Sequence, residues 1–236
     1  METSVAPADT TRRQLLALAL PATAVLLLIG ESLTPAGLDQ TPMSAASALP
    51  LLPKAAAHVN QLYFSNALVL LGLGTLLISY LALTQLARLR GATLATVAAA
   101  IGCLAAFAGI VANALAGFNL ATVVSADLTA KQAAGFVARS FSSKAGEAFL
   151  NTYFLGNIVA LVLMAVALWL SRNVPWWLAI LLPVTFELAG FAPAGPSAIP
   201  WMLPFVVLSA VFARRIWTQA RGFEISVTGE MAAVAR

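Results

Sequence analysis

The sequence predicts an all-α polytopic membrane protein, a bundle of six transmembrane helices with both termini in the cytoplasm. Of its 236 residues, 61% are hydrophobic and only 9% are charged, against about 45–50% and about 25% in soluble proteins. The apolar residues form six continuous stretches, over residues 14–30, 62–87, 92–116, 150–170, 176–191 and 199–216. Because the strands of a membrane β-barrel alternate apolar and polar residues, continuous stretches favour helices within a single membrane domain.

The lengths of these stretches support the same fold class. A helix needs about 20 residues to cross a hydrocarbon core about 30 Å thick. The first stretch (14–30) and the fifth (176–191) are short by this measure. We nevertheless expect both to be spans, and the lipid bilayer is therefore the first expected partner of the chain.

The basic residues predict the orientation. With six spans, nine arginines lie on the side of the amino terminus: Arg12, Arg13, Arg88, Arg90, Arg172, Arg214, Arg215, Arg221 and Arg236. The other side holds Lys54, Lys131, Arg139 and Lys144. Because cytoplasmic loops carry the excess of Lys and Arg, both termini are expected in the cytoplasm, in the plasma membrane of a bacterium, its inner membrane. The same residues account for the net charge of +4. No basic cluster interleaves with aromatic residues, so no nucleic-acid partner is expected.

The pair Arg12 and Arg13 before the first stretch also resembles a twin-arginine export signal, with Ala45 to Ala48 as a small-residue processing region. Five further apolar stretches follow, and a double arginine is the usual cytoplasmic anchor of a first helix. We therefore expect the first helix to be retained.

Two long outer connections and a carboxyl-terminal tail complete the expected organisation. Residues 31–61 contain four prolines, yet 45–57 is largely apolar, so this loop is expected to lie on the membrane or over the bundle, where it could act as a lid. Residues 125–149 have helix-forming composition, with Val137 and Phe141 four apart. They predict a helix in the membrane interface or one packed on the bundle. Residues 219–236 are expected to be a loose tail.

The third stretch carries a stripe of small residues. Spacings of three and four place seven of them on one face of a helix: Ala95, Ala98, Gly102, Ala105, Gly109, Ala112 and Ala116. Helix association in lipid depends on close van der Waals contact, which small residues permit. We expect this helix to be central, with its helix partner either in the same chain or in a second copy.

A short similarity links the second and fourth stretches. Asn60 to Asn66 (NQLYFSN) resembles Asn151 to Asn157 (NTYFLGN). Two parallel helical hairpins of common origin would place a binding site where the repeats meet, as in some transporters. Aromatic enrichment at the membrane boundary would produce the same similarity without a repeat.

Polar residues gather toward the outer ends of the expected spans. At about 1.5 Å per residue, several of them come within about 10 Å of the outer interface and two lie at its edge. We predict that they line an outward-facing polar pocket that binds a small-molecule or lipid ligand: Glu187, Asn157, Asn113, Asn66, Glu31 and His58. The alternative is that helix ends are simply wetter than helix centres.

Glu187 is the firmest member of this set, because a carboxyl group in a span costs several kcal/mol unless it is paired, hydrated or protonated. It is either a structural partner of a basic group or a residue that exchanges protons or binds a ligand. Pro183 lies one turn before it and cannot donate to the carbonyl of Ala179. A local opening of the helix is expected there, with Thr185 available to satisfy freed backbone groups.

The other reactive residue types are scarce. Cys103 is the only cysteine and His58 the only histidine, so the chain cannot form an internal disulfide, a bis-histidine haem site or a His-rich metal site. No Cys-x-x-Cys-His sequence is present. We expect no metal and no cofactor.

Three classes of function remain open. A binding or transport protein for a small or amphipathic molecule explains the outer polar residues, the proline-broken fifth and sixth stretches and the lid. An accessory subunit of a larger membrane complex explains the small-residue stripe and the short cytoplasmic loops. An intramembrane enzyme would use Glu187 as general acid or base on a lipid-like substrate, but no Asp-rich, Gly-x-Ser-x-Gly, His-Glu-x-x-His or nucleotide-loop motif accompanies it. The first class is therefore the prediction.

Overall fold

The computed structural model describes residues 7–38, 44–87, 91–115 and 119–234, with side chains described for residues 11–38, 44–87, 91–115, 119–140 and 142–218. Within these ranges every regular element is a helix. Five helical segments are long and apolar enough to cross a membrane: Thr11–Leu33, Val59–Ala87, Ala92–Asn113, Lys144–Ser171 and Pro196–Thr218. The all-α prediction is confirmed, and these segments indicate a membrane protein.

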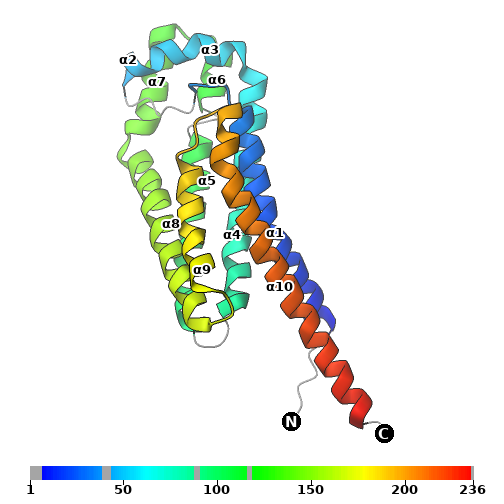
Figure 1. The fold of residues 1–236 in the computed structure, drawn as a ribbon. Coiled ribbons are helices and arrows are strands. Elements are labelled where there is room, and N and C mark those ends of the chain that lie inside the picture. The colour runs from blue at the N-terminus through cyan, green and yellow to red at the C-terminus, as the bar shows by residue number, and fades with distance from the viewer. Residues whose placement is uncertain (1–6, 39–43, 88–90, 116–118, 235–236) are drawn as a thin grey trace.

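The predicted stretches correspond to the long elements of the fold: α1 (Pro7–Leu33), α4 (Val59–Thr84), α5 (Ala92–Asn113), α8 (Lys144–Ser171), α9 (Trp176–Gly190) and α10 (Ile199–Val234). Shorter helices connect them: α2 (Ala45–Ala48), η1 (Leu49–Leu51), α3 (Leu52–Ala57), η2 (Gln85–Ala87), α6 (Asn119–Ser125), α7 (Ala130–Ser142) and η4 (Pro196–Ala198). The start of α1 and the end of α10 lie at the same end of the bundle (Figure 1).

The ends of two elements differ from the sequence prediction. Helix α10 continues to Val234, so the segment predicted as a loose tail from residue 219 is helical as far as Val234. It contains no proline and several strong helix formers, which allows the apolar helix before it to continue. Helix α8 begins at Lys144 instead of residue 150, because Ser143 caps its first turn through the hydrogen bond from Gly146 N to Ser143 Oγ.

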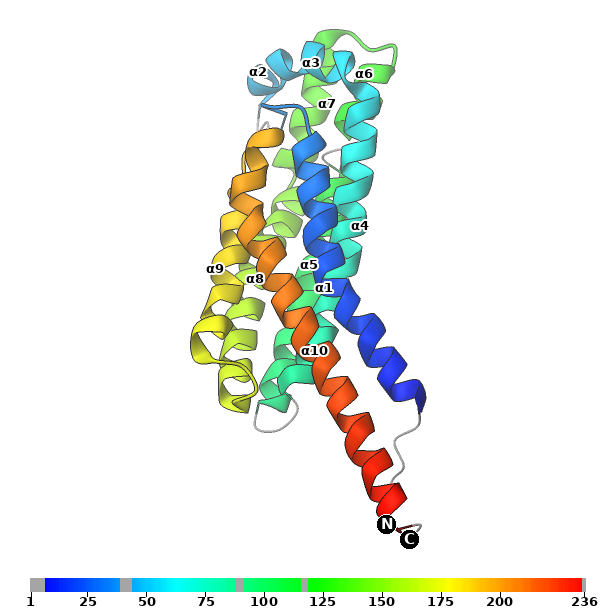
Figure 2. The same ribbon diagram turned by 45° about the vertical axis from the view of Figure 1, so that its right-hand side comes forward.

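Helix α9 is the sixth predicted span. Its 15 residues extend about 22 Å at 1.5 Å per residue, less than the hydrocarbon core, and it is not among the five segments of spanning length. It runs alongside α8 and α10 (Figures 1 and 2). After it, the backbone N–H of Gly195 donates to Glu31 O at 2.9 Å, which ties the connection between α9 and α10 to the end of α1. Whether α9 crosses a membrane stays a prediction.

The long helices form a closed ring. Each packs against the next in the order α1, α4, α5, α8, α9 and α10, and α10 packs against α1 (Figure 2). One cluster of buried apolar residues joins all six helices. Any empty space inside this ring is therefore enclosed by six different helices.

Helices α1 and α4 approach closely through two glycines that the sequence analysis did not single out. A Cβ atom on Gly30 would lie 2.7 Å from Val69 Cγ2, and one on Gly72 would lie 2.8 Å from Leu27 Cδ2. Lower in the same contact, Thr23 Oγ1 and Ser79 Oγ are 2.9 Å apart. Small residues and hydroxyl pairs thus join these helices as expected for association in lipid.

The small-residue stripe of α5 faces α4 and α8 of the same chain. Its residues from Ala95 to Gly109 are buried, whereas Ala116 lies outside the described residues. A Cβ atom on Gly102 would collide with the ring of Tyr80, and one on Gly109 with the ring of Tyr153. The central-helix prediction agrees with this packing, but the glycines accommodate two tyrosine rings instead of the backbone of a neighbouring helix.

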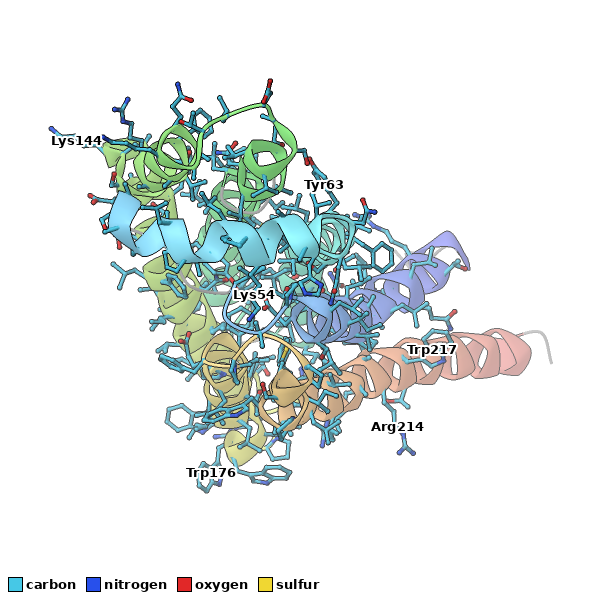
Figure 3. The ribbon with its side chains drawn as sticks, turned by 90° about the horizontal axis from the view of Figure 1, so that it is seen from above. Lys54, Tyr63, Lys144, Trp176, Arg214 and Trp217 are labelled. Carbon is cyan, nitrogen blue, oxygen red and sulfur yellow. The ribbon has the colours of Figure 1, made fainter. Side chains whose placement is uncertain are left out.

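The first outer connection lies across one end of the bundle (Figures 1 and 3). Its helices α2 and α3 pack against α7 and α6 from the second connection, and together they bury a second apolar cluster that includes Leu52 and Val137. Lys54 lies above the bundle in the view of Figure 3, where its Nζ donates to Ala36 O. Of the two expected arrangements for residues 31–61, the one over the bundle is present. The side chain of Phe141 lies outside the described part.

Replacing Gly109 with leucine tests the packing of α5. The new side chain would occupy the space of the Tyr153 ring, and overpacking of a buried site costs about 1–3 kcal/mol. We expect a lower free energy of unfolding in mixed micelles and a lower folded yield. The control is Ala100→Leu at an exposed position of the same helix, which should be close to neutral; equal losses in the two variants would show that Gly109 faces lipid.

Candidate functional site

A cavity of about 560 Å³ lies inside the ring, in the half nearer to α6 and α7. All six long helices contribute to its wall, because it occupies the space between them. Its apolar lining includes Leu27, Leu62, Val69, Leu73, Leu150, Phe186, Met202 and Phe205. The polar lining consists of Glu31, Thr34, Asn66, Asn113, Ser140 and Tyr153. The cavity thus combines a mostly apolar wall with a few polar groups, as small-molecule sites do.

Three of the six predicted site residues meet at this cavity. Glu31 lines it from the end of α1, Asn66 from α4 and Asn113 from the end of α5. The Nδ2 atom of Asn66 is buried without a hydrogen-bond partner among the described residues. Asn113 Nδ2 donates to Gly109 O at 3.1 Å. Glu31 is the one ionisable carboxyl group in the described lining, and no lysine, arginine or histidine appears there.

Tyr80 and Asn157 form a buried hydrogen-bond network next to the cavity, on the side away from α6 and α7. Tyr80 Oη donates to Asn157 Oδ1 at 2.6 Å, and Asn157 Nδ2 donates to Tyr153 O at 2.7 Å. Tyr80 and Asn157 are each only 1% exposed. Since Tyr153 itself lines the cavity, this network lies directly behind the cavity wall and connects α4 with α8.

Asn157 and His58 occupy positions that differ from the predicted pocket. The amide oxygen and the amide nitrogen of Asn157 are both hydrogen-bonded inside the bundle, and Asn157 is not among the described lining residues. His58 is exposed at the junction of α3 and α4, where it forms the amino-terminal cap position of α4. Depth counting along a helix does not show which way a side chain points, and this explains both differences.

Glu187 lies behind the cavity wall. Its side chain is half-buried on α9 and is close enough to Tyr153 and Tyr80 to interact with both electrostatically, but it is not among the described lining residues. Its neighbourhood is therefore the network of Tyr80 and Tyr153, to which the predicted residue Asn157 also belongs.

Helix α9 remains continuous through Pro183. The expected role of Thr185 is partly present. Its Oγ1 donates to Leu181 O at 2.8 Å, although the carbonyl that lacks its usual donor belongs to Ala179. The hydroxyl therefore supports the helix near the proline without replacing the missing bond itself.

The cavity reaches the outer surface of the ring. Phe154 on α8 and Phe191 after α9 both line it, yet they are 46% and 75% exposed. Side chains that contact both the interior space and the surroundings lie at an opening. This opening lies between α8 and the end of α9.

Tyr80 and Tyr153 are the site residues that sequence reasoning missed. A signal was available, because Tyr153 and Asn157 are four residues apart and share a helix face, and both belong to the segment that resembles Asn60 to Asn66. Comparison of the chain with protein-family models, with curated proteins and with solved structures found no match. Any inference about function therefore rests on the geometry alone. The geometry is that of a helical membrane protein with an internal, partly polar cavity.

Replacing Tyr80 with phenylalanine tests the network behind the cavity. The change keeps the ring in the space left by Gly102 and leaves the buried Asn157 Oδ1 without its donor, which costs about 1–3 kcal/mol. We expect that loss in the free energy of unfolding. A double-mutant cycle with Asn157→Leu should give a favourable coupling of about 1 kcal/mol. Asn151→Leu, exposed on the same helix as Asn157, is the control, and a coupling near zero would contradict the account.

Proposed function

We propose that the protein binds, and transfers between membrane and cavity, an amphipathic molecule with a cationic or hydrogen-bond-donating head group. One observation carries this proposal. A single cavity has a carboxyl group at one end, apolar side chains over most of its wall and an opening on the side of the bundle. A water-soluble solute would not need an opening between helices, and a wholly apolar ligand would leave the buried Asn66 Nδ2 without a hydrogen-bond partner.

The charge of the lining supports the choice of head group. Glu31 is the one carboxyl group in the described wall, and the described lining contains no lysine, arginine or histidine. A cationic head group would compensate the carboxylate, whereas an anionic one would add a like charge in a region of low dielectric constant. The side-chain amides of Asn66 and Asn113 lie on neighbouring helices. Their oxygen atoms can accept from donor groups of the ligand, and the buried Asn66 Nδ2 can donate to an acceptor on its head group.

The apolar wall supports the presence of a hydrocarbon chain. Leu73, Met202 and Phe205 line the cavity from α4 and α10. A volume of about 560 Å³ lies within the range of about 300–1,000 Å³ that is common for small-molecule sites. A ligand with its head at Glu31 would extend its chain along these residues or out between Phe154 and Phe191.

The orientation belongs to the same proposal. The excess of arginines on the side of the termini favours a cytoplasmic location for that side. The end with α2, α3, α6 and α7 would then face outward, and the cavity would open in the outer half of a bacterial inner membrane. With α9 as a sixth crossing, both termini lie on one side, in agreement with the positions of α1 and α10 in Figure 1.

Two observations bear on the alternative functions. The small-residue stripe, which favoured an accessory subunit, packs from Ala95 to Gly109 against the same chain, with Tyr80 and Tyr153 at its glycines. Glu187, the general acid or base of an intramembrane enzyme, lies outside the described cavity lining. The binding proposal uses the groups that the cavity does contain.

Binding of decyltrimethylammonium to the full chain in nanodiscs tests the proposal, with empty nanodiscs as the background. Glu31→Gln should weaken binding about tenfold or more, because it removes the carboxylate that faces the cation. Glu147→Gln, an exposed carboxylate on α8 outside the described lining, should change binding less than twofold. The unfolding midpoint without ligand is measured for each variant to separate binding from folding. Equal binding by Glu31→Gln, or equally tight binding of decyl sulfate, would refute the proposed ligand class.

Single-cysteine labelling tests the orientation. In a chain with Cys103→Ala, a cysteine at Ser44 or Ser142 should react with an impermeant maleimide in intact cells, and one at Thr218 should react only after lysis. All three positions are exposed, so access to the side chain does not limit the reaction. The opposite pattern would show that the termini face outward.

A further inference from the structure

A second cavity, of about 640 Å³, lies at the opposite end of the bundle, beside the turn between α8 and α9. It shares no described lining residue with the first cavity and contains no residue of the Tyr80–Asn157 network. Its wall contains two arginines, Arg172 and Arg215, and two tryptophans, Trp169 and Trp176. This combination of cationic and amphipathic aromatic groups is chemically unlike the first cavity.

The position of Arg215 is fixed by hydrogen bonds. Its Nη1 donates to Asn173 O at 3.2 Å, and Asn173 Nδ2 donates to Leu86 O at 2.7 Å. This chain of bonds joins α10, the turn after α8 and the end of η2. A guanidinium group that is held in this way, half-buried beside the cavity, is oriented before any ligand arrives, which lowers the entropic cost of binding.

The local charge is positive. The acidic residues with described side chains are Glu31, Asp127, Glu147 and Glu187, and all belong to the half of the bundle with the first cavity. None is in the described lining of the second cavity. Its two guanidinium groups therefore have no carboxylate beside them within the described lining, so an anionic ligand would find unopposed positive charge.

The tryptophans place this cavity at the level of a membrane interface. Trp169 and Trp176 are 58% and 62% exposed, and Trp176 projects outward from the rim of the bundle in Figure 3. Exposed tryptophan at the end of an apolar helix is typical of the boundary between hydrocarbon and head groups. A ligand in this cavity would therefore be within reach of lipid head groups.

The backbone at Arg172 has an unusual conformation for arginine. With φ of 58°, it is the one non-glycine residue with positive φ among the described residues. The position ends α8, where glycine is the usual residue, and an L-residue in this conformation is strained. Glycine would therefore suit this backbone position better than arginine.

We propose that this second cavity binds the phosphate group of an anionic phospholipid. Arg172 and Arg215 would pair with the phosphate, since guanidinium groups match its geometry. Trp169 and Trp176 would lie against the glycerol and upper acyl region. Basic pockets between transmembrane helices recognise anionic head groups in this way. The proposal does not depend on the function of the first cavity.

Native mass spectrometry of the full chain in detergent tests this site, with phosphatidylglycerol and phosphatidylcholine of identical acyl chains as probes. The wild-type chain should bind the first phosphatidylglycerol about tenfold more tightly than phosphatidylcholine. Arg172→Gly should reduce phosphatidylglycerol binding about fivefold, because one basic residue near an anionic lipid contributes about that factor. Glycine also suits the backbone there, so the variant should unfold at the same temperature or a higher one.

Arg214→Gln is the matched control, because Arg214 is an exposed neighbour of Arg215 outside the described lining. It should change phosphatidylglycerol binding less than twofold. Equal affinity for the two lipids, or equal losses in Arg172→Gly and Arg214→Gln, would overturn the proposal. Displacement of phosphatidylglycerol by an equal concentration of inorganic phosphate would overturn the lipid as the source of the phosphate group.

Discussion

The hydrogen bond from Tyr80 Oη to Asn157 Oδ1 joins α4 to α8 in the middle of the bundle, and the arrangement of the other helices depends on it. Both side chains are almost completely buried, where an unpaired polar group costs several kcal/mol in lipid. The pair therefore fixes the distance between two helices that are not neighbours in the ring. Helix α5 lies between them and makes room with Gly102 for the ring of Tyr80.

This interaction also divides the interior into two halves. On the side of the termini, apolar residues of all six helices fill the ring. On the other side, the tyrosines and Asn157 end the packed region, and the first cavity occupies the space up to α6 and α7. The helices of the outer connections pack on one another, so they close the end of the bundle while the side between Phe154 and Phe191 stays open.

Much of the fold could be predicted because the length and hydrophobicity of each helix are read directly along the sequence. The helix ranges, the central position of α5 and the gathering of Glu31, Asn66 and Asn113 were all predictable from spacing and depth. The direction of a side chain around its helix axis depends on the neighbours, and this is why Asn157, His58 and Glu187 were assigned to a pocket that they do not line. Helix α10 exceeded its predicted end because its tail contains no proline and several strong helix formers.

The central claim is that the bundle holds a cavity on the α6 and α7 side of the Tyr80–Asn157 pair and is packed on the other side. Cysteine accessibility in a chain with Cys103→Ala tests it most directly. Ala112 lines the first cavity, whereas Ala160 is fully buried one turn beyond Asn157 on α8. A cysteine at Ala112 should react with a small methanethiosulfonate reagent added to the folded protein in nanodiscs, and one at Ala160 should react only after unfolding. Equal reactivity at the two positions, whether high or low, would contradict the account.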